Sequence, residues 1–316
     1  MTLLENSKTI AMIKNSLYLL LILASTQLFN SCSGCAGNQS KSSDSLQLTD
    51  SVISDAPLKL SEDIMGEVIQ NISSPVEMAN LIKSSGADFS QRILNNPDNI
   101  SKYETSFKRA LNLGVFSADL GYINIFDKNN VVVSYLLAVK NLADGIRVGQ
   151  FFDFNALRSM ASNSTNLDSL MEMSVSSFNK MDSYLRDQNR SNVSTLIVTG
   201  TWIEGLYIAS NVVKETNSKE LAIRIAEQKN IIDILDIILN NYISEPNFSS
   251  LVEDIQRLKM AYAPIRITTE LGEPKRIEKD GMLIVIQDEV STAHYTDEQL
   301  ITIMDLIIEI RNKIVE

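Results

Sequence analysis

From Leu58 onward, apolar residues recur at the three- and four-residue spacing that marks one face of an α-helix. Short polar breaks divide this part of the chain into amphipathic segments. These are residues 58–71, 75–83, 90–95, 101–126, 130–146, 155–162, 166–188, 192–214, 218–242 and 248–261, and a last segment after Thr296. Helices joined by such short connections pack as antiparallel neighbours. The pattern therefore predicts an all-α fold, an antiparallel helical bundle.

Polar residues at three helix starts match N-terminal capping patterns. Ser101 with Glu104 and Thr296 with Gln299 have the spacing of a capping box, and Asn217 or Ser218 precedes an acidic first turn. The helix after Thr296 should present its apolar residues on one face. They are Leu300, Ile303, Met304, Ile307, Ile310 and Ile314.

The segment before this last helix has a different pattern. Residues 265–269, 275–279 and 282–287 have the composition of strands, and Asp280-Gly281 is a typical hairpin turn. We expect a small C-terminal β-hairpin, followed by a helix that folds back on the bundle. A helical or irregular tail is the alternative.

Two stretches of the helical region resemble each other. Gly114-Val-Phe-Ser-Ala-Asp-Leu-Gly-Tyr-Ile and Gly200-Thr-Trp-Ile-Glu-Gly-Leu-Tyr-Ile both place a carboxylate inside an apolar run. The glycines are 86 positions apart and the carboxylates 85. A duplicated helical hairpin, which would give the bundle a two-fold internal repeat, explains these offsets. Chance similarity between two amphipathic helices is the alternative.

The N-terminus has the pattern of a secretion signal. An apolar run over residues 17–29 follows Lys14 and would span about 20 Å as a helix, which is too short to cross a bilayer core of about 30 Å. Translation could begin at Met1 or at Met12. The run ends at Ser31-Cys32, which resembles the lipobox of bacterial lipoproteins, with Cys32 as the lipidated residue and Cys35 as the second choice. An ordinary signal peptide or a Cys32–Cys35 disulfide is the alternative.

Residues 33–56 are rich in Ser, Asp and Gln, which is typical of a flexible tether. Ser45 and Ser51 each follow an Asp in a short motif that resembles bacterial O-glycosylation sites. A Ser directly after Cys32 resembles the sorting signal for the outer membrane. The chain thus divides into a signal peptide (1–31), a tether (32–56), a helical bundle (57–263) and a C-terminal hairpin and helix (264–316).

Asp119 and Glu204 are the most suggestive candidate site residues, because a carboxylate inside an apolar segment must be paired, protonated or exposed. If the repeat brings them together, they could form an acid/base pair or a cation site, or line a ligand pocket between the repeats. The other expected lining residues of that pocket are Phe116, Tyr122, Trp202 and Tyr207. The alternative is structural, with the carboxylates paired to Lys140, Arg224, Tyr122 or Tyr207.

Both repeats also contain glycines, at positions 114, 121, 200 and 205. Each destabilises a helix by about 1 kcal/mol relative to alanine. We expect close contact between helices, or space for a ligand, to compensate.

Composition excludes several classes of function. The 316 residues include one histidine and two cysteines, and the net charge is -11. His294 lies outside the expected bundle, which argues against histidine-ligated metal sites and histidine-dependent hydrolases. The acidic charge disfavours nucleic-acid binding. No nucleotide-binding glycine motif occurs, so we expect no cofactor, no metal and no catalytic residues.

The lipobox-like segment, the tether and residues 113–120 and 200–207 together resemble a family of uncharacterised bacterial lipoproteins, over residues 101–262. The resemblance implies a cell-envelope protein and assigns no role to individual residues. We expect a protein anchored by lipid on Cys32 to the outer membrane, facing the periplasm or the cell surface. Its helical body would bind an envelope protein or a glycan without catalysis. A small-ligand-binding lipoprotein with its site between the repeats is the alternative.

Overall fold

The structure is a computed structural model, which describes residues 75–161, 167–272, 275–279, 282–286 and 289–316. All of them belong to one compact unit within Asp55–Glu316. The expected signal peptide, tether and first helix lie outside the described residues. So do the lipidation candidate Cys32 and the glycosylation candidates Ser45 and Ser51.

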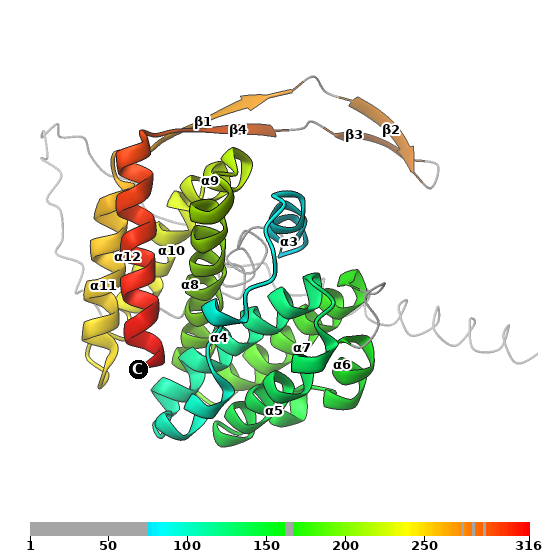
Figure 1. Cartoon of the computed structure of the whole chain (residues 1–316), viewed down its shortest axis with the longest axis vertical. Coiled ribbons are helices and arrows are strands. Elements are labelled where there is room, and N and C mark those ends of the chain that lie inside the picture. The colour runs from blue at the N-terminus through cyan, green and yellow to red at the C-terminus, as the bar shows by residue number, and fades with distance from the viewer. Residues whose placement is uncertain (1–74, 162–166, 273–274, 280–281, 287–288) are drawn as a thin grey trace, which may run out of the picture. The chain divides into compact units, whose positions relative to one another are not determined.

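The described residues form mostly helices, which confirms the all-α fold (Figure 1). The α-helices are α3 (Pro75–Ser84), α4 (Ser106–Ile125), α5 (Asn129–Gly145), α6 (Phe154–Ala161), α7 (Leu167–Asp187), α8 (Ser191–Thr216), α9 (Lys219–Ala226), α10 (Lys229–Asn240), α11 (Phe248–Tyr262) and α12 (Asp297–Val315). Short 3₁₀ helices are η1 (Gln91–Ile93), η2 (Pro97–Lys102) and η3 (Gly149–Phe151).

Two of the expected helix starts are confirmed and one is wrong. Thr296 and Gln299 form a capping box at α12, and the Ser218 side chain accepts a hydrogen bond at the start of α9. The Ser101–Glu104 box does not form, because Ser101 belongs to η2. The helix α4 starts later, where the Thr105 side chain accepts a hydrogen bond from the Lys108 amide.

The single helix expected over residues 218–242 is two helices, α9 and α10, which was not predicted. The break contains no glycine or proline. It falls at Glu227 and Gln228, where the buried Gln228 side chain accepts a hydrogen bond from Trp202 Nε1 at 2.9 Å. The hydrogen bond from Trp202 of α8 therefore lies at the break between α9 and α10, which no local sequence signal predicts.

The helices α4 and α8 form the centre of the fold and share its most extensive contact. Gly114 lies against Ile197 and Thr201, Gly200 lies against Leu111, and Thr201 Oγ1 donates a hydrogen bond to the Gly114 carbonyl. Asp119 and Glu204, which follow these glycines in the chain, also interact, so the two helices run in the same direction. The two similar segments thus contact each other at Gly114 and Gly200. Their parallel packing differs from the antiparallel packing expected of consecutive helices, because α5, α6 and α7 lie between them in the chain.

The predicted close contact between helices is confirmed for one glycine of each repeat. A Cβ at Gly114 would lie 2.1 Å from the Ile197 carbonyl oxygen, and one at Gly200 would lie 2.0 Å from that of Leu111. Only glycine permits this approach of two backbones. A Cβ at Gly121 or Gly205 would meet nothing within 4 Å, so close helix contact does not explain these two.

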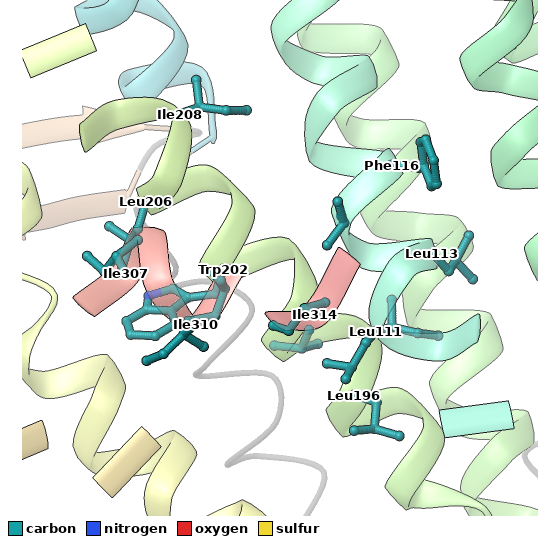
Figure 2. Packing of buried hydrophobic residues seen from close by; sticks show 14 of the residues in the cluster. Leu111, Leu113, Phe116, Leu196, Trp202, Leu206, Ile208, Ile307, Ile310 and Ile314 are labelled. Carbon is teal, nitrogen blue, oxygen red and sulfur yellow. The ribbon is translucent and has the colours of Figure 1, made fainter. Parts of the chain in front are cut away.

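Apolar side chains of α4, α8 and α12 make up much of the core (Figure 2). Ile307 and Ile310 of α12 lie beside Trp202 and Leu206 of α8. Within the described residues, only α8 is long and apolar enough to cross a membrane, but 83% of its apolar window is buried inside the protein. We therefore describe α8 as a core helix.

The C-terminal segment forms a β-ribbon followed by α12, as expected. β1 (Arg266–Leu271) pairs antiparallel with β4 (Glu289–His294), and β2 (Lys275–Lys279) pairs antiparallel with β3 (Met282–Ile286). The strand β4 was not predicted. The helix α12 packs on α8 and α11, and all six apolar residues of its predicted face are buried.

The glycine contacts predict opposite effects for matched alanine substitutions. Gly114→Ala and Gly200→Ala should each lower the free energy of unfolding by about 3 kcal/mol, because the helices must separate to admit the methyl group. Gly121→Ala and Gly205→Ala should leave it unchanged or raise it by up to about 1 kcal/mol. Urea unfolding followed by circular dichroism measures all four, and equal effects in both pairs would refute the close crossing.

Candidate functional site

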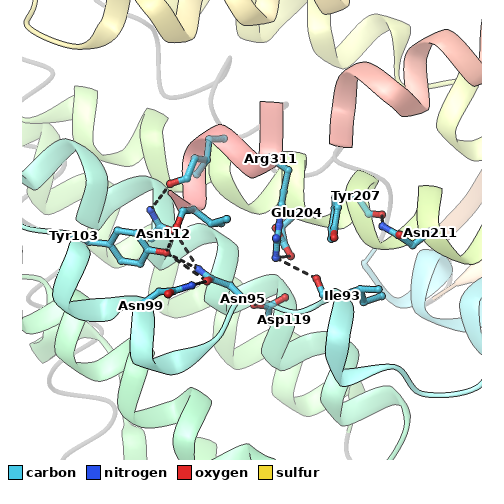
Figure 3. A network of polar contacts seen from close by, with 12 residues as sticks. Ile93, Asn95, Asn99, Tyr103, Asn112, Asp119, Glu204, Tyr207, Asn211 and Arg311 are labelled. Carbon is cyan, nitrogen blue, oxygen red and sulfur yellow. Dashed lines mark hydrogen bonds and ion pairs between the residues drawn. The ribbon is translucent and has the colours of Figure 1, made fainter. Parts of the chain in front are cut away.

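The two carboxylates singled out in the sequence meet at the α4–α8 contact. Asp119 and Glu204 follow the glycine crossing by about one helical turn, and both are 0% exposed. A third residue, Arg311 of α12, lies against them and is 6% exposed (Figure 3). Arg311 Nε donates to Glu204 Oε2 at 2.8 Å, and Arg311 Nη2 donates to Glu204 Oε1 at 2.9 Å. The site is therefore a buried bidentate ion pair beside a second carboxyl group.

Further contacts hold the guanidinium of Arg311. Its Cζ lies 4.2 Å from the centre of the Tyr207 ring, a cation–π geometry, and Nη2 also donates to the Ile93 carbonyl at 3.1 Å. Burial opposes the charge on Arg311, but the hydrogen bonds to Glu204 and the attraction of that carboxylate outweigh it, so the pKa of the guanidinium is raised. Arg311 stays charged in the core.

Asp119 has the environment of a protonated acid. Its pKa is raised well above the usual range, first by burial and then by repulsion from Glu204. Asp119 Oδ2 accepts a hydrogen bond from the backbone N–H of Asn95 at 3.1 Å. Asp119 Oδ1 has no donor among the described residues. A proton on Asp119 resolves this, because the neutral carboxyl can donate to the Glu204 carboxylate. The cluster then holds one negative and one positive charge.

A second set of polar contacts extends the cluster to the end of α12 (Figure 3). Asn95 Nδ2 donates to the Tyr103 hydroxyl at 3.0 Å and to Asn112 Oδ1 at 3.2 Å. The Tyr103 hydroxyl donates to the Val315 carbonyl and Asn112 Nδ2 to that of Ile314, both at 3.0 Å. These bonds satisfy carbonyls in the last turn of α12, which lack partners within the helix.

The partner of the carboxylates differs from the candidates named in the structural alternative. Lys140 pairs with Asp144, and Arg224 pairs with Glu227. Tyr122 lies elsewhere, with its hydroxyl accepting a hydrogen bond from the Ser90 amide. Of the four candidates, Tyr207 alone belongs to the cluster, through its ring. Arg311 was not predicted, although it is a charged residue at a position that continues the apolar face of α12.

The aromatic residues expected to line a pocket do not gather around the carboxylates. Trp202 donates to Gln228 at 2.9 Å, the ring of Phe116 contacts that of Tyr135, and Tyr122 stacks on Phe89. Phe116, Trp202 and Tyr122 are buried, each in its own contact. The structure thus brings together Asp119, Glu204 and Tyr207, and places the other three apart.

The described residues contain no group of three His, Cys, Asp or Glu side chains that could hold a metal ion. His294 lies on β4, where its Nε2 is 2.9 Å from Thr268 Oγ1. Two carboxyl groups that share a proton could in principle act as acid and base. Here both are fully buried, and Glu204 joins α8 to α12 through its ion pair with Arg311.

The raised pKa of Asp119 predicts that Asp119→Asn stabilises the protein as the pH rises. A carboxyl whose folded pKa is raised contributes its full stability below about pH 4, and the contribution is lost as the pH rises through the folded pKa. Asparagine keeps both hydrogen bonds and does not ionise. The stability gained by Asp119→Asn should grow by up to about 1.4 kcal/mol per pH unit between the pKa of the unfolded chain and the raised pKa of folded Asp119. Denaturant unfolding of both proteins between pH 5 and pH 8 measures it, and parallel stability curves would contradict it.

The double variant Asp119→Asn/Glu204→Gln should have the opposite effect. It leaves the Arg311 charge buried without a counter-charge, which should lower the free energy of unfolding by about 3–5 kcal/mol. Adding Arg311→Met should restore part of that loss, because the unpaired charge is removed. Asp305→Asn, at an exposed position of α12, is the control for loss of one negative charge.

Comparisons with known proteins do not extend these findings. No family model, no curated protein and no solved structure matches this chain. The roles of Asp119, Glu204 and Arg311 therefore rest on the geometry described above.

Proposed function

We propose that this chain is a lipid-anchored protein of the bacterial cell envelope, whose helical body binds an envelope protein or a glycan without catalysing a reaction. The anchor is supported by the sequence alone, through the short apolar run at residues 17–29, Cys32 and the polar tether that follows. Ser33 after Cys32 favours the outer membrane. The acidic charge of the chain disfavours a nucleic-acid partner.

The burial of Asp119, Glu204 and Arg311 is the observation that carries the non-catalytic part of the proposal. A catalytic carboxyl group must reach substrate or water. These two carboxyl groups are fully buried, and Glu204 is fully used in its ion pair with Arg311. The strongest acid/base candidates in the sequence are thus employed in holding α12 against α4 and α8.

A small-ligand site between the repeats receives less support. A ligand could contact Asp119 or Glu204 only after the surrounding helices had moved, because both carboxyl groups are fully buried and Glu204 is bonded to Arg311. Phe116, Trp202 and Tyr122 are likewise engaged in separate contacts within the core. Binding at an external face of the helical body requires no such opening.

The anchor predicts covalent incorporation of fatty acid at one cysteine. Cells that express the full chain and are grown with radioactive palmitate should yield a labelled protein in the membrane fraction. Cys32→Ala should abolish the label, because the thiol that receives the lipid is lost. Gel autoradiography of the immunoprecipitated chain measures the incorporation.

Cys35→Ala is the matched control, since it removes the neighbouring thiol and should leave the label unchanged. Loss of the label in Cys35→Ala but not in Cys32→Ala would move the lipid to Cys35. Equal labelling of both variants and the wild type would refute a lipid on either cysteine.

A further inference from the structure

The ladder of β2 and β3 has two open edges in the described part of the chain. Lys275 of β2 is paired with Ile286 of β3, and Lys279 with Met282. The ladder is a separate two-stranded sheet, and the extensive contacts of its strands are with each other, whereas β4 touches α9. A two-stranded ribbon is only marginally stable in water. Each outer edge carries backbone groups that can pair with another strand.

The two edges differ in charge. The strand β2 has the sequence Lys-Arg-Ile-Glu-Lys and β3 the sequence Met-Leu-Ile-Val-Ile. Charged residues, lysine above all, protect exposed edges from pairing with other chains. Four of the five residues of β2 are charged, whereas β3 contains no charged residue. β3 is therefore the edge suited to receive a further strand.

We propose that β3 pairs with β3 of a second copy of this chain, in an antiparallel dimer about a two-fold axis. An uncharged strand can pair with an identical strand without charge repulsion, so the same segment of each copy forms its half of the contact. The resulting sheet has the order β2–β3–β3–β2. Its outer edges are the charged β2 strands, which stop further growth and keep the assembly at two copies.

The reach of the ribbon permits this contact. Six residues of β1 and five of β2 lie between α11 and the hairpin end at Lys279. At about 3.3 Å per residue, these strands alone extend roughly 35 Å. Two helical bodies can therefore remain apart while their β3 strands pair. The dimer does not depend on the proposed lipid anchor, although anchoring on one membrane would raise the local concentration of the two copies.

Matched lysine substitutions test the β3 edge. Ile277 of β2 and Ile284 of β3 are paired in register, so lysine at either position removes one apolar residue from the same pair and adds one charge. In the full chain in mild detergent, sedimentation equilibrium should show a dimer. Ile284→Lys should weaken the dimer at least tenfold and Ile277→Lys less than threefold. A wild-type monomer at all concentrations, or equal weakening by both variants, would overturn the proposal.

Introduced cysteines test the pairing of β3 with itself. Cys32→Ala and Cys35→Ala remove both natural cysteines. In an antiparallel pair, residues near the two-fold axis have Cα atoms about 4.5–5.5 Å apart, within reach of a disulfide. Single cysteines along β3 should give a covalent dimer under copper–phenanthroline oxidation at one position or two adjacent ones. Ile277→Cys should give none, and cross-linking as strong from Ile277→Cys as from β3 would overturn the proposal.

Discussion

A charged guanidinium inside a protein core needs a counter-charge, and the arrangement of three helices follows from how Arg311 obtains one. Its two hydrogen bonds to Glu204 join α12 to α8. Once Glu204 is committed to Arg311, a second negative charge on Asp119 would be repelled, so burial and Glu204 together raise the pKa of Asp119. The neutral Asp119 then completes the link to α4. One ion pair and one proton thus connect the helices.

This constraint gives the last helix a specific position. The apolar face of α12 would tolerate some sliding along α8, because apolar contact has little directionality. Arg311 removes that freedom, since a bidentate pair forms in one geometry only. Asn112 and Tyr103 act in the same way on the carbonyls of Ile314 and Val315. Polar contacts therefore determine the register of α12, and apolar burial supplies most of its stabilisation.

The carboxyl pair also depends on the glycine crossing. Gly114 and Gly200 allow the backbones of α4 and α8 to touch, and Asp119 and Glu204 follow about one turn later on the same two helices. With larger residues at the crossing, the helices would stand further apart and the two carboxyl groups would separate. The repeated pattern of glycine followed by a carboxylate thus encodes one local structure, with Arg311 as the element outside the repeat.

The sequence alone determined most of the described helical segments, the capping box at Thr296, the β-hairpin and the two unusual carboxylates, because spacing along the chain reports which face of a helix is apolar. It could also have identified Arg311, the one charged residue at a position that continues the apolar stripe of α12. Only the tertiary structure decided that Arg311 is the partner of Glu204, which lies 107 residues away. Likewise it decided the break at Gln228, where Trp202 of another helix supplies the contact. Periodicity identifies the buried face of a helix, but the helix opposite that face is chosen by packing across the whole chain.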